Sequence, residues 1–291
     1  MPVAAFDASS QASNTPVTVD GPHGPIRLKW HKLRTRLGEA PFKRSNLALG
    51  WQLGASLEVD ILAIADGRLA VLHDPTLGPS TTGRGRVSQI PISSMDGLFH
   101  RDSNGIPDPD APVLSLAELL APLRALPKAP SANLQLDLKL LDGRILSDIA
   151  IADARAAVAG LAEGIIIGSH HLDDARRLAA AIPGARLGYD PMLAVSRQPG
   201  LRDPERLLRH VERRMAGMTL AYLRFDAIVA AEKQGFPLVA RLLDLGIETD
   251  AWTVNPRRET RDATLCTLAE AKVRQITTEA PSEIFRLIRS L

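Results

Sequence analysis

The chain has 291 residues, of which 45% are hydrophobic and 23% are charged, and its formal net charge is +2. This length suits one large α/β barrel of about 250 residues or two smaller domains, with ample apolar material for a core. So small a net charge does not indicate a nucleic-acid partner. The single cysteine, Cys266, excludes an internal disulfide framework and a cysteine-based zinc cluster.

The beginning of the chain is rich in Ala, Ser, Thr, Asn and Pro. This composition predicts a flexible, loosely ordered arm over residues 1–25, followed by a single domain over residues 26–291. The arm lacks the basic and apolar regions of a signal peptide, and no stretch approaches the roughly 18 apolar residues of a membrane span. We therefore expect a soluble, cytoplasmic protein.

Short apolar segments then alternate with helical patterns, which is typical of βα units around a parallel sheet. Eight segments are predicted strands: Ile26–His31, Ser56–Asp60, Asn133–Lys139, Gly164–Gly168, Ala185–Tyr189, Ala221–Phe225, Glu248–Val254 and Val273–Thr277. Helices are predicted over Leu47–Leu53, Leu172–Ala181, Pro204–Met215, Ala227–Leu245 and Arg258–Ala271. Eight strands favour an α/β fold of the (β/α)₈ TIM-barrel type over an open doubly wound sheet.

One region interrupts this alternation after the second predicted strand. Asp66-Gly67 joins two alternating runs, and Asp-Gly in that position predicts a β-hairpin. The hairpin would return His73 to the end of the strand that carries Glu58 and Asp60. Because the residues that follow show little periodicity, we predict a hairpin-containing insertion at about residues 61–112. It would lie over the mouth of the barrel where active sites of this fold form.

Acidic residues stand near the ends of two predicted strands. Glu58 and Asp60 alternate on one strand, and Asp137 stands two positions before Lys139 on the next. Carboxylates on otherwise apolar strands are costly to bury without a counter-charge. A divalent cation with oxygen ligands, Mg²⁺ or Ca²⁺, is the natural counter-charge. Lys139 would stand beside the cation as a point charge for a phosphate oxygen.

Two histidines lie close to these acids in the predicted fold. His31 ends the first predicted strand, at the carboxyl rim of the barrel, and the hairpin brings His73 toward the same rim. A histidine at a strand end is more often structural than catalytic, but next to three strand-end acids the balance reverses. Imidazole is suited to general acid–base catalysis at neutral pH. The arrangement indicates phosphodiester chemistry.

Several short motifs follow one another in a specific order. Glu-x-Asp at Glu58 precedes Asp-Gly at Asp66, His-Asp-Pro-Thr-Leu at His73 and Thr-Thr-Gly at Thr81, and LQLDLK, AWTVN and QITTEAP come later. In these motifs the chain resembles the glycerophosphodiester phosphodiesterases, which share a barrel with sphingomyelinase D and phosphatidylinositol-specific phospholipase C. The resemblance runs from His31 to about residue 285.

The resemblance implies a set of roles. Glu58, Asp60 and Asp137 match the metal ligands, His31 and His73 match the catalytic pair, and Lys139 and Trp252 match positions that line the substrate pocket. The expected reaction is metal-dependent hydrolysis of a glycerophosphodiester to sn-glycerol 3-phosphate and an alcohol, and the expected partner is a small-molecule glycerophosphodiester or lysophospholipid substrate. We favour His31 as base and His73 as acid, with water or the neighbouring glycerol hydroxyl as nucleophile.

The chain departs from the family pattern at three places. The family's His-Arg-Gly is His31-Lys32-Leu33, so the phosphate-contacting arginine is absent or is replaced by Lys32, Arg34 or Arg36. The Pro-Glu-Asn-Thr motif is missing. The third metal ligand, usually Glu, is Asp137, as in sphingomyelinase D. Two alternatives therefore stay open: a phospholipase D-like lyase that forms a cyclic phosphate, and a non-catalytic barrel that binds phosphate ligands.

The second half of the chain contains a pair of histidines and an arginine-rich segment. His170-His171 follow a predicted strand and could reach the site, although a structural role is more common for such residues. The arginines between residues 197 and 214 are interspersed with acidic residues, which favours a solvated helix face over a site for anionic lipid.

Overall fold

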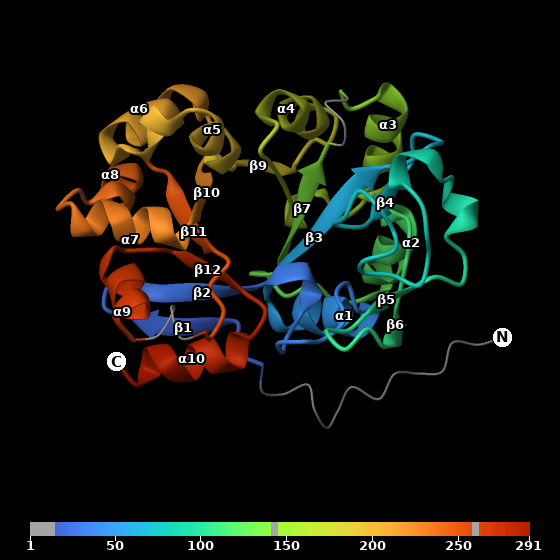
Figure 1. Ribbon diagram of the computed structural model, residues 1–291, viewed down its shortest axis with the longest axis horizontal. Helices are drawn as coiled ribbons and strands as arrows, with labels where there is room; N and C mark the ends of the chain where they lie inside the picture. Colours follow the sequence, from blue (N-terminus) through green and yellow to red (C-terminus); the bar gives the residue numbers. More distant parts are fainter. Residues whose placement is uncertain (1–14, 141–144, 258–261) are drawn as a thin grey trace.

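The computed structural model describes residues 15–140, 145–257 and 262–291. At its centre, parallel strands close into a barrel surrounded by helices (Figure 1). In order around the barrel, the eight strands are β2 (Gly24–Trp30), β3 (Ser56–Ala63), β7 (Asn133–Lys139), β8 (Ile165–Ser169), β9 (Arg186–Tyr189), β10 (Leu220–Arg224), β11 (Glu248–Trp252) and β12 (Gln275–Thr278). The pairings of β2 with β12 and with β3 close the ring. The predicted (β/α)₈ barrel is confirmed.

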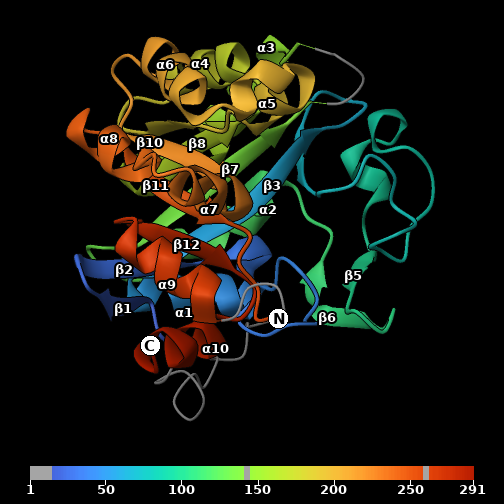
Figure 2. The same ribbon diagram turned by 60° about the vertical axis from the view of Figure 1, so that its left-hand side comes forward.

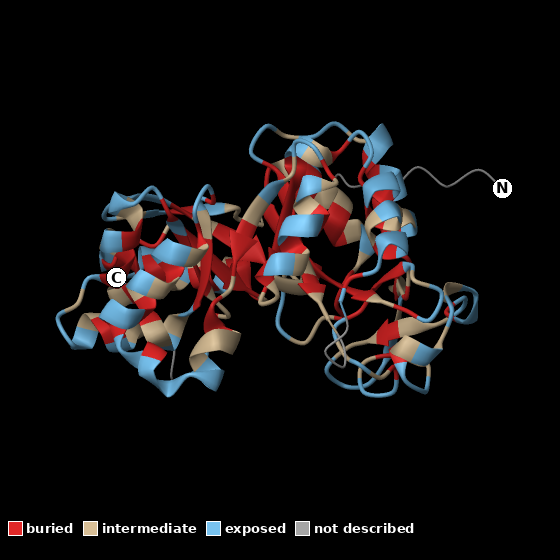
Figure 3. Cartoon of the chain, turned by 90° about the horizontal axis from the view of Figure 1, so that it is seen from above, coloured by how far each residue is buried: buried red, intermediate tan, exposed pale blue. Residues whose placement is uncertain are grey.

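Helices cover the outside of the barrel, where their apolar faces meet the outward side chains of the strands (Figure 3). They are α1 (Arg44–Leu53), α2 (Leu116–Leu120), α3 (Asp148–Ala157), α4 (Leu172–Ala180), α5 (Met192–Arg197), α6 (Pro204–Arg214), α7 (Phe225–Lys233), α8 (Leu238–Asp244), α9 (Asp262–Glu270) and α10 (Pro281–Arg289). Short 3₁₀ turns occur at His31–Leu33, Val87–Gln89, Ile92–Ser94, Ala121–Ala125, Ala162–Gly164 and Pro199–Arg202. None of the described helices has both the length and the apolar character that crossing a membrane requires.

One helix prediction differs from the structure, and another begins outside the described residues. The single helix predicted over Ala227–Leu245 is two helices, α7 and α8. Gly235 adopts a left-handed conformation with φ of 71° and Pro237 follows it, a combination that ends one helix and precludes a continuous one. The beginning of the predicted helix at Arg258–Ala271 lies outside the described residues.

Sequence patterns missed α2, α3, α5 and α10, although α3 and α10 each begin at a recognisable signal. The Ser147 hydroxyl caps α3 by accepting from the N–H of Ala150, and Pro281 opens α10.

The stretch for which the composition predicts an arm contains an ordered strand. Thr18–Gly21 form β1, which pairs antiparallel with β2 in the register Val19 to Ile26. Val19 is buried against the second half of the barrel core. Residues 18–21 therefore belong to the sheet instead of an arm, while residues 1–14 lie outside the described part of the chain.

The insertion after the second barrel strand forms as predicted. Strand β4 (Leu69–Val71) pairs antiparallel with the end of β3, and Gly67 takes the positive φ of 78° that the tight turn requires. Farther along, β5 (Phe99–Arg101) and β6 (Pro107–Pro112) form a two-stranded sheet that lies to one side of the barrel (Figure 2). A small apolar cluster of its own, which includes Leu72, Leu77 and Met95, holds the insertion together.

Alternation along the strands separates an apolar outer face from a polar inner face. On β7, Leu134, Leu136 and Leu138 pack outward with the helices, while Gln135 and Asp137 point into the barrel and line a cavity. In the β3–β7 register, Asp60 lies directly beside Asp137. Strand alternation and register together therefore bring the predicted acidic residues to one place inside the barrel mouth.

Candidate active site

Three carboxylates converge at this place. Glu58, Asp60 and Asp137 offer oxygen atoms that all lie within 4.8 Å of one another. Glu58 and Asp60 are only 3% and 1% exposed. Burial, together with the charges of Asp60 and Asp137, raises the pKa of Glu58 to about 8. The three carboxylates thus lack the positive charge needed to keep all of them ionised at neutral pH.

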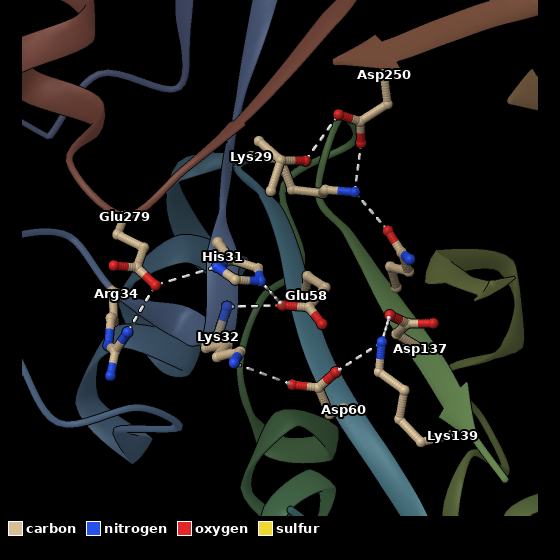
Figure 4. Close-up of polar contacts among 12 residues, drawn as sticks. Lys29, His31, Lys32, Arg34, Glu58, Asp60, Asp137, Lys139, Asp250 and Glu279 are labelled. Atoms are coloured by element: carbon tan, nitrogen blue, oxygen red, sulfur yellow. Dashed lines mark hydrogen bonds and ion pairs between the residues drawn. The ribbon is translucent and has the colours of Figure 1, made fainter. Parts of the chain in front are cut away.

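Two lysines supply part of this charge (Figure 4). The Nζ atom of Lys139 lies 2.5 Å from Oδ2 of Asp137 and 3.4 Å from Oδ1 of Asp60. The Nζ atom of Lys32 lies 4.0 Å from Oδ2 of Asp60. Although burial opposes ionisation, the two lysines lower the pKa of Asp60. Lys32 is closest to the acids of the three basic residues considered for the missing arginine, but it does not line the cavity.

The donor set of the cluster fits a hard divalent cation. Oδ2 of Asp60 is buried and receives no hydrogen bond from any described residue. An uncompensated buried carboxylate oxygen is costly, and oxygen-only ligands suit Mg²⁺ or Ca²⁺. The residues present could therefore hold a metal ion of this type.

A strained turn at the end of β2 shapes one side of the cluster. Lys32 and Leu33 both have left-handed backbone conformations, with φ of 54° and 57°. Such conformations cost roughly 1–2 kcal/mol for each non-glycine residue. The turn directs the N–H of Lys32 at Oε2 of Glu58, at 2.7 Å. Strain at this point is thus coupled to a hydrogen bond that orients a candidate metal ligand.

His31 occupies the same turn and faces two carboxylates. Its Nδ1 lies 3.2 Å from Oε1 of Glu279, and its Nε2 lies 3.9 Å from Oε2 of Glu58. Glu279 also accepts a hydrogen bond of 2.6 Å from Nη1 of Arg34. Although burial opposes it, these hydrogen bonds lower the pKa of Glu279 to about 2. This geometry fits a His31 that carries a hydrogen on Nδ1 and donates it to Glu279. Its Nε2 then faces the carboxylate cluster.

Sequence patterns did not single out Glu279. It follows β12 in the motif QITTEAP, and residues that follow barrel strands gather at the carboxyl rim. That position, together with the place of QITTEAP among the family motifs, was the signal available in the sequence.

His73 reaches the cavity from the other direction, on the segment that follows β4. Its Nδ1 lies 2.8 Å from Oδ1 of Asp74, and its side chain is 45% exposed. The β3–β4 hairpin thus brings His73 to the cavity that His31 and the acidic cluster also line. The two histidines differ in environment, because one is enclosed and the other stands at the open edge.

The cavity has a volume of about 160 Å³ and extends from the cluster across the barrel. Trp252 lines it, and His170, Asp190 and Tyr222 form the wall on the far side.

The floor of the cavity holds a buried polar network. Lys29 bonds both Asp250 and Gln135, and Asp250 also accepts hydrogen bonds of 2.7 Å from Gln275 and Thr277. Sequence patterns did not identify this network, because its members are spread over four strands, β2, β7, β11 and β12.

Comparisons with known proteins agree with this architecture. No protein-family model matches the chain, and no curated protein sequence matches it. The chain is similar to the solved structure of a glycerophosphodiester phosphodiesterase from Agrobacterium tumefaciens, with 20% identity, 91% of this chain and 100% of that chain covered, and a TM-score of 0.61. Another glycerophosphodiester phosphodiesterase, from Parabacteroides distasonis, shares 19% identity over 90% of this chain and 96% of that chain, with a TM-score of 0.63.

A phosphodiesterase from Oleispira antarctica, solved with the product sn-glycerol-3-phosphate, shares 18% identity over 90% of this chain and 96% of that chain, with a TM-score of 0.62. At such identities the likeness establishes the fold. This chain has the barrel seen in structures of glycerophosphodiester phosphodiesterases.

Proposed function

We propose that this protein is a glycerophosphodiester phosphodiesterase, which hydrolyses its substrates to sn-glycerol 3-phosphate and an alcohol with the help of a divalent cation. One observation carries the proposal: the carboxylates of Glu58, Asp60 and Asp137 cluster within 4.8 Å, and His31 and His73 line the same cavity. The shared fold supports it, since three solved structures with this fold are named as phosphodiesterases.

In this proposal, Glu58, Asp60 and Asp137 hold Mg²⁺ or Ca²⁺. When bound there, the cation would supply positive charge to a non-bridging phosphate oxygen. Lys139, whose Nζ already lies beside Asp60 and Asp137, provides a second positive charge for the phosphate. Trp252 lines the substrate pocket, and Lys32 adds positive charge at the edge of the cluster.

The two histidines divide the proton transfers. Glu279 holds Nδ1 of His31 as a donor, so Nε2 is free to accept a proton from water or from the glycerol hydroxyl. His73, with its Nδ1 held by Asp74, protonates the leaving alkoxide. Its exposed position at the cavity edge suits this role, because the released alcohol must reach solvent.

One observation favours a second function. Asp137 is shorter than the glutamate usual among the phosphodiesterases and matches the sphingomyelinase D pattern. A lyase of that type would expel the head group and leave a cyclic phosphate. The small volume of the cavity, about 160 Å³, favours a small polar ester over a whole phospholipid.

Phosphorus NMR distinguishes these functions. The protein is incubated with glycerophosphocholine or lysophosphatidylcholine, first with Mg²⁺ or Ca²⁺ and then with a chelator. Hydrolysis is supported by a phosphate monoester that forms only with the cation: glycerol phosphate from glycerophosphocholine, or acyl-glycerol phosphate from lysophosphatidylcholine. A persistent cyclic phosphate supports the lyase. Unchanged substrates, tested together with bis(4-nitrophenyl) phosphate and glycerophosphoglycerol, would support a non-catalytic phosphate-binding barrel.

A further inference from the structure

The far wall of the cavity carries polar groups that the proposed reaction does not use. His170 follows β8 and Asp190 follows β9, the strand that lies across the barrel from β2 and His31. Nδ1 of His170 lies 3.4 Å from Oδ1 of Asp190, and both side chains are largely buried. Asp190 is itself fixed by the N–H of Met192 at 2.8 Å. The pair therefore lies on a surface that a bound diester would contact.

The acidic groups of this wall and floor already have positive partners. Asp190 pairs with His170, Asp137 pairs with Lys139, and Asp250 pairs with Lys29. The face of the Tyr222 ring is also taken, since Nζ of Lys29 lies 4.5 Å from its centroid. A quaternary ammonium group is recognised by free carboxylates or open aromatic faces. These carboxylates and the Tyr222 ring are therefore closed to such a group, because the described cations already occupy them.

Other groups on the same wall lack partners. Tyr222 is 3% exposed, and its hydroxyl receives and donates no hydrogen bond among the residues that the structure describes. Nε1 of Trp252 is likewise buried and has no hydrogen-bond partner among the described residues. Burial raises the pKa of Tyr222 well above its ordinary range, so the group remains a phenol that can donate. Unpaired buried donors carry a desolvation cost that a ligand hydroxyl can remove.

We propose that His170, Asp190 and Tyr222 form a subsite that selects a neutral, hydroxyl-bearing head group, such as glycerol or inositol, over a quaternary ammonium head group. The proposal rests on the phosphodiesterase function proposed above. A polyol offers hydroxyls that both donate and accept, which matches an imidazole nitrogen, a carboxylate oxygen and a phenol. A trimethylammonium group offers no hydrogen-bond donor and adds a positive charge next to Lys29, Lys139 and His170.

The test is a competition between glycerophosphoglycerol and glycerophosphocholine in one reaction, with the ratio of their kcat/KM values as the readout. We expect the wild-type protein to prefer glycerophosphoglycerol by at least ~10-fold, which is the effect of one or two hydrogen bonds. Tyr222→Phe removes only the hydroxyl, and His170→Phe removes the imidazole nitrogens. Each variant should reduce the preference by about 5-fold or more, chiefly through KM for glycerophosphoglycerol.

His171→Phe is the matched control, because His171 adjoins His170 in the chain but does not line the cavity. It should keep the wild-type preference. Equal turnover of both substrates by the wild type, or a preference that survives both Tyr222→Phe and His170→Phe, would overturn the subsite. Hydrolysis of bis(4-nitrophenyl) phosphate, which has no polyol arm, separates the two proposals. If the wild type cleaves it but shows no preference, the subsite fails while the phosphodiesterase function stands.

Discussion

Nδ1 of His31 lies 3.2 Å from Oε1 of Glu279, although 248 positions separate the two residues in the chain. The barrel makes this contact possible because its first and last strands, β2 and β12, are neighbours. The carboxylate that orients the proposed base therefore comes from the end of the sequence. Arg34 holds the same carboxylate in place at 2.6 Å.

Glu279→Gln tests this contact. The substitution preserves size but removes the charge that favours an Nδ1–H on His31, so kcat should fall by ~10–100-fold, while KM changes less. Steady-state kinetics measure both. If His31 needs no orienting carboxylate, kcat will stay near the wild-type value. A melting temperature close to that of the wild type will show that the loss is not one of folding.

His31→Ala and His73→Ala test the two proton-transfer roles. Each should lower turnover by at least ~10²-fold, the usual contribution of a general acid or base, without unfolding the protein. His23→Ala is a control at a distance, since His23 pairs with Glu270 at the surface. A histidine variant that keeps the wild-type rate removes that residue from the mechanism.

Metal binding should depend on pH in a definite direction. The pKa of Glu58 is raised to about 8 without a cation, so it must lose a proton before it can act as a ligand. Affinity for Mg²⁺ or Ca²⁺ should therefore fall as pH drops below about 8. Titration calorimetry in two buffers of different ionisation enthalpy will detect the proton released. Asp60→Asn should abolish the cation-dependent rise in melting temperature, whereas Asp66→Asn, in the hairpin turn, should keep it.

His100 should make the protein less stable in mild acid. It is buried against Phe42, with ring centroids 5.1 Å apart, and burial lowers its pKa to about 4 from an ordinary value of 6.5. The unfolded chain thus binds a proton more readily than the native state between these values. Stability from this group is fully present above pH 6.5 and is lost as pH falls toward 4, by about 3 kcal/mol.

Urea unfolding at pH 7 and pH 4.5 measures this effect. His100→Gln should make the free energy of unfolding less dependent on pH over this interval, and the same change at surface His23 is the control. An unaltered pH dependence in His100→Gln would assign the acid sensitivity to other groups.

The buried pair of Lys29 and Asp250 should be more costly to break than to replace. Both side chains are at most 3% exposed. Asp250→Ala leaves a charged ammonium inside the barrel and should reduce the free energy of unfolding by about 3–5 kcal/mol. The double variant Lys29→Met with Asp250→Asn should lose less, because no unpaired charge remains. Equal losses in the single and double variants would show that the ion pair is not the source of the effect.

The sequence by itself determined the eight barrel strands, the hairpin after the second of them and most of the candidate chemistry. Period-two alternation placed Glu58, Asp60 and Asp137 on the inner faces of strands, and Asp66-Gly67 located the hairpin that returns His73 to the site. These signals are local, since each depends on residues only a few positions apart. The break between α7 and α8 is also encoded locally, by Gly235 and Pro237. The helical pattern of apolar residues continues through these two positions, which is why one helix is predicted there.

Only the tertiary structure decided which distant residues meet. Glu279 beside His31, Lys29 beside Asp250 and His170 beside Asp190 are pairs brought together by barrel closure or by neighbouring strand ends. Nothing in the spacing of either partner indicates the other, because contact across a closed sheet depends on strand order and register. The wall that we propose to choose the head group consists of such residues, so sequence patterns could predict a phosphodiesterase but not its preferred substrate.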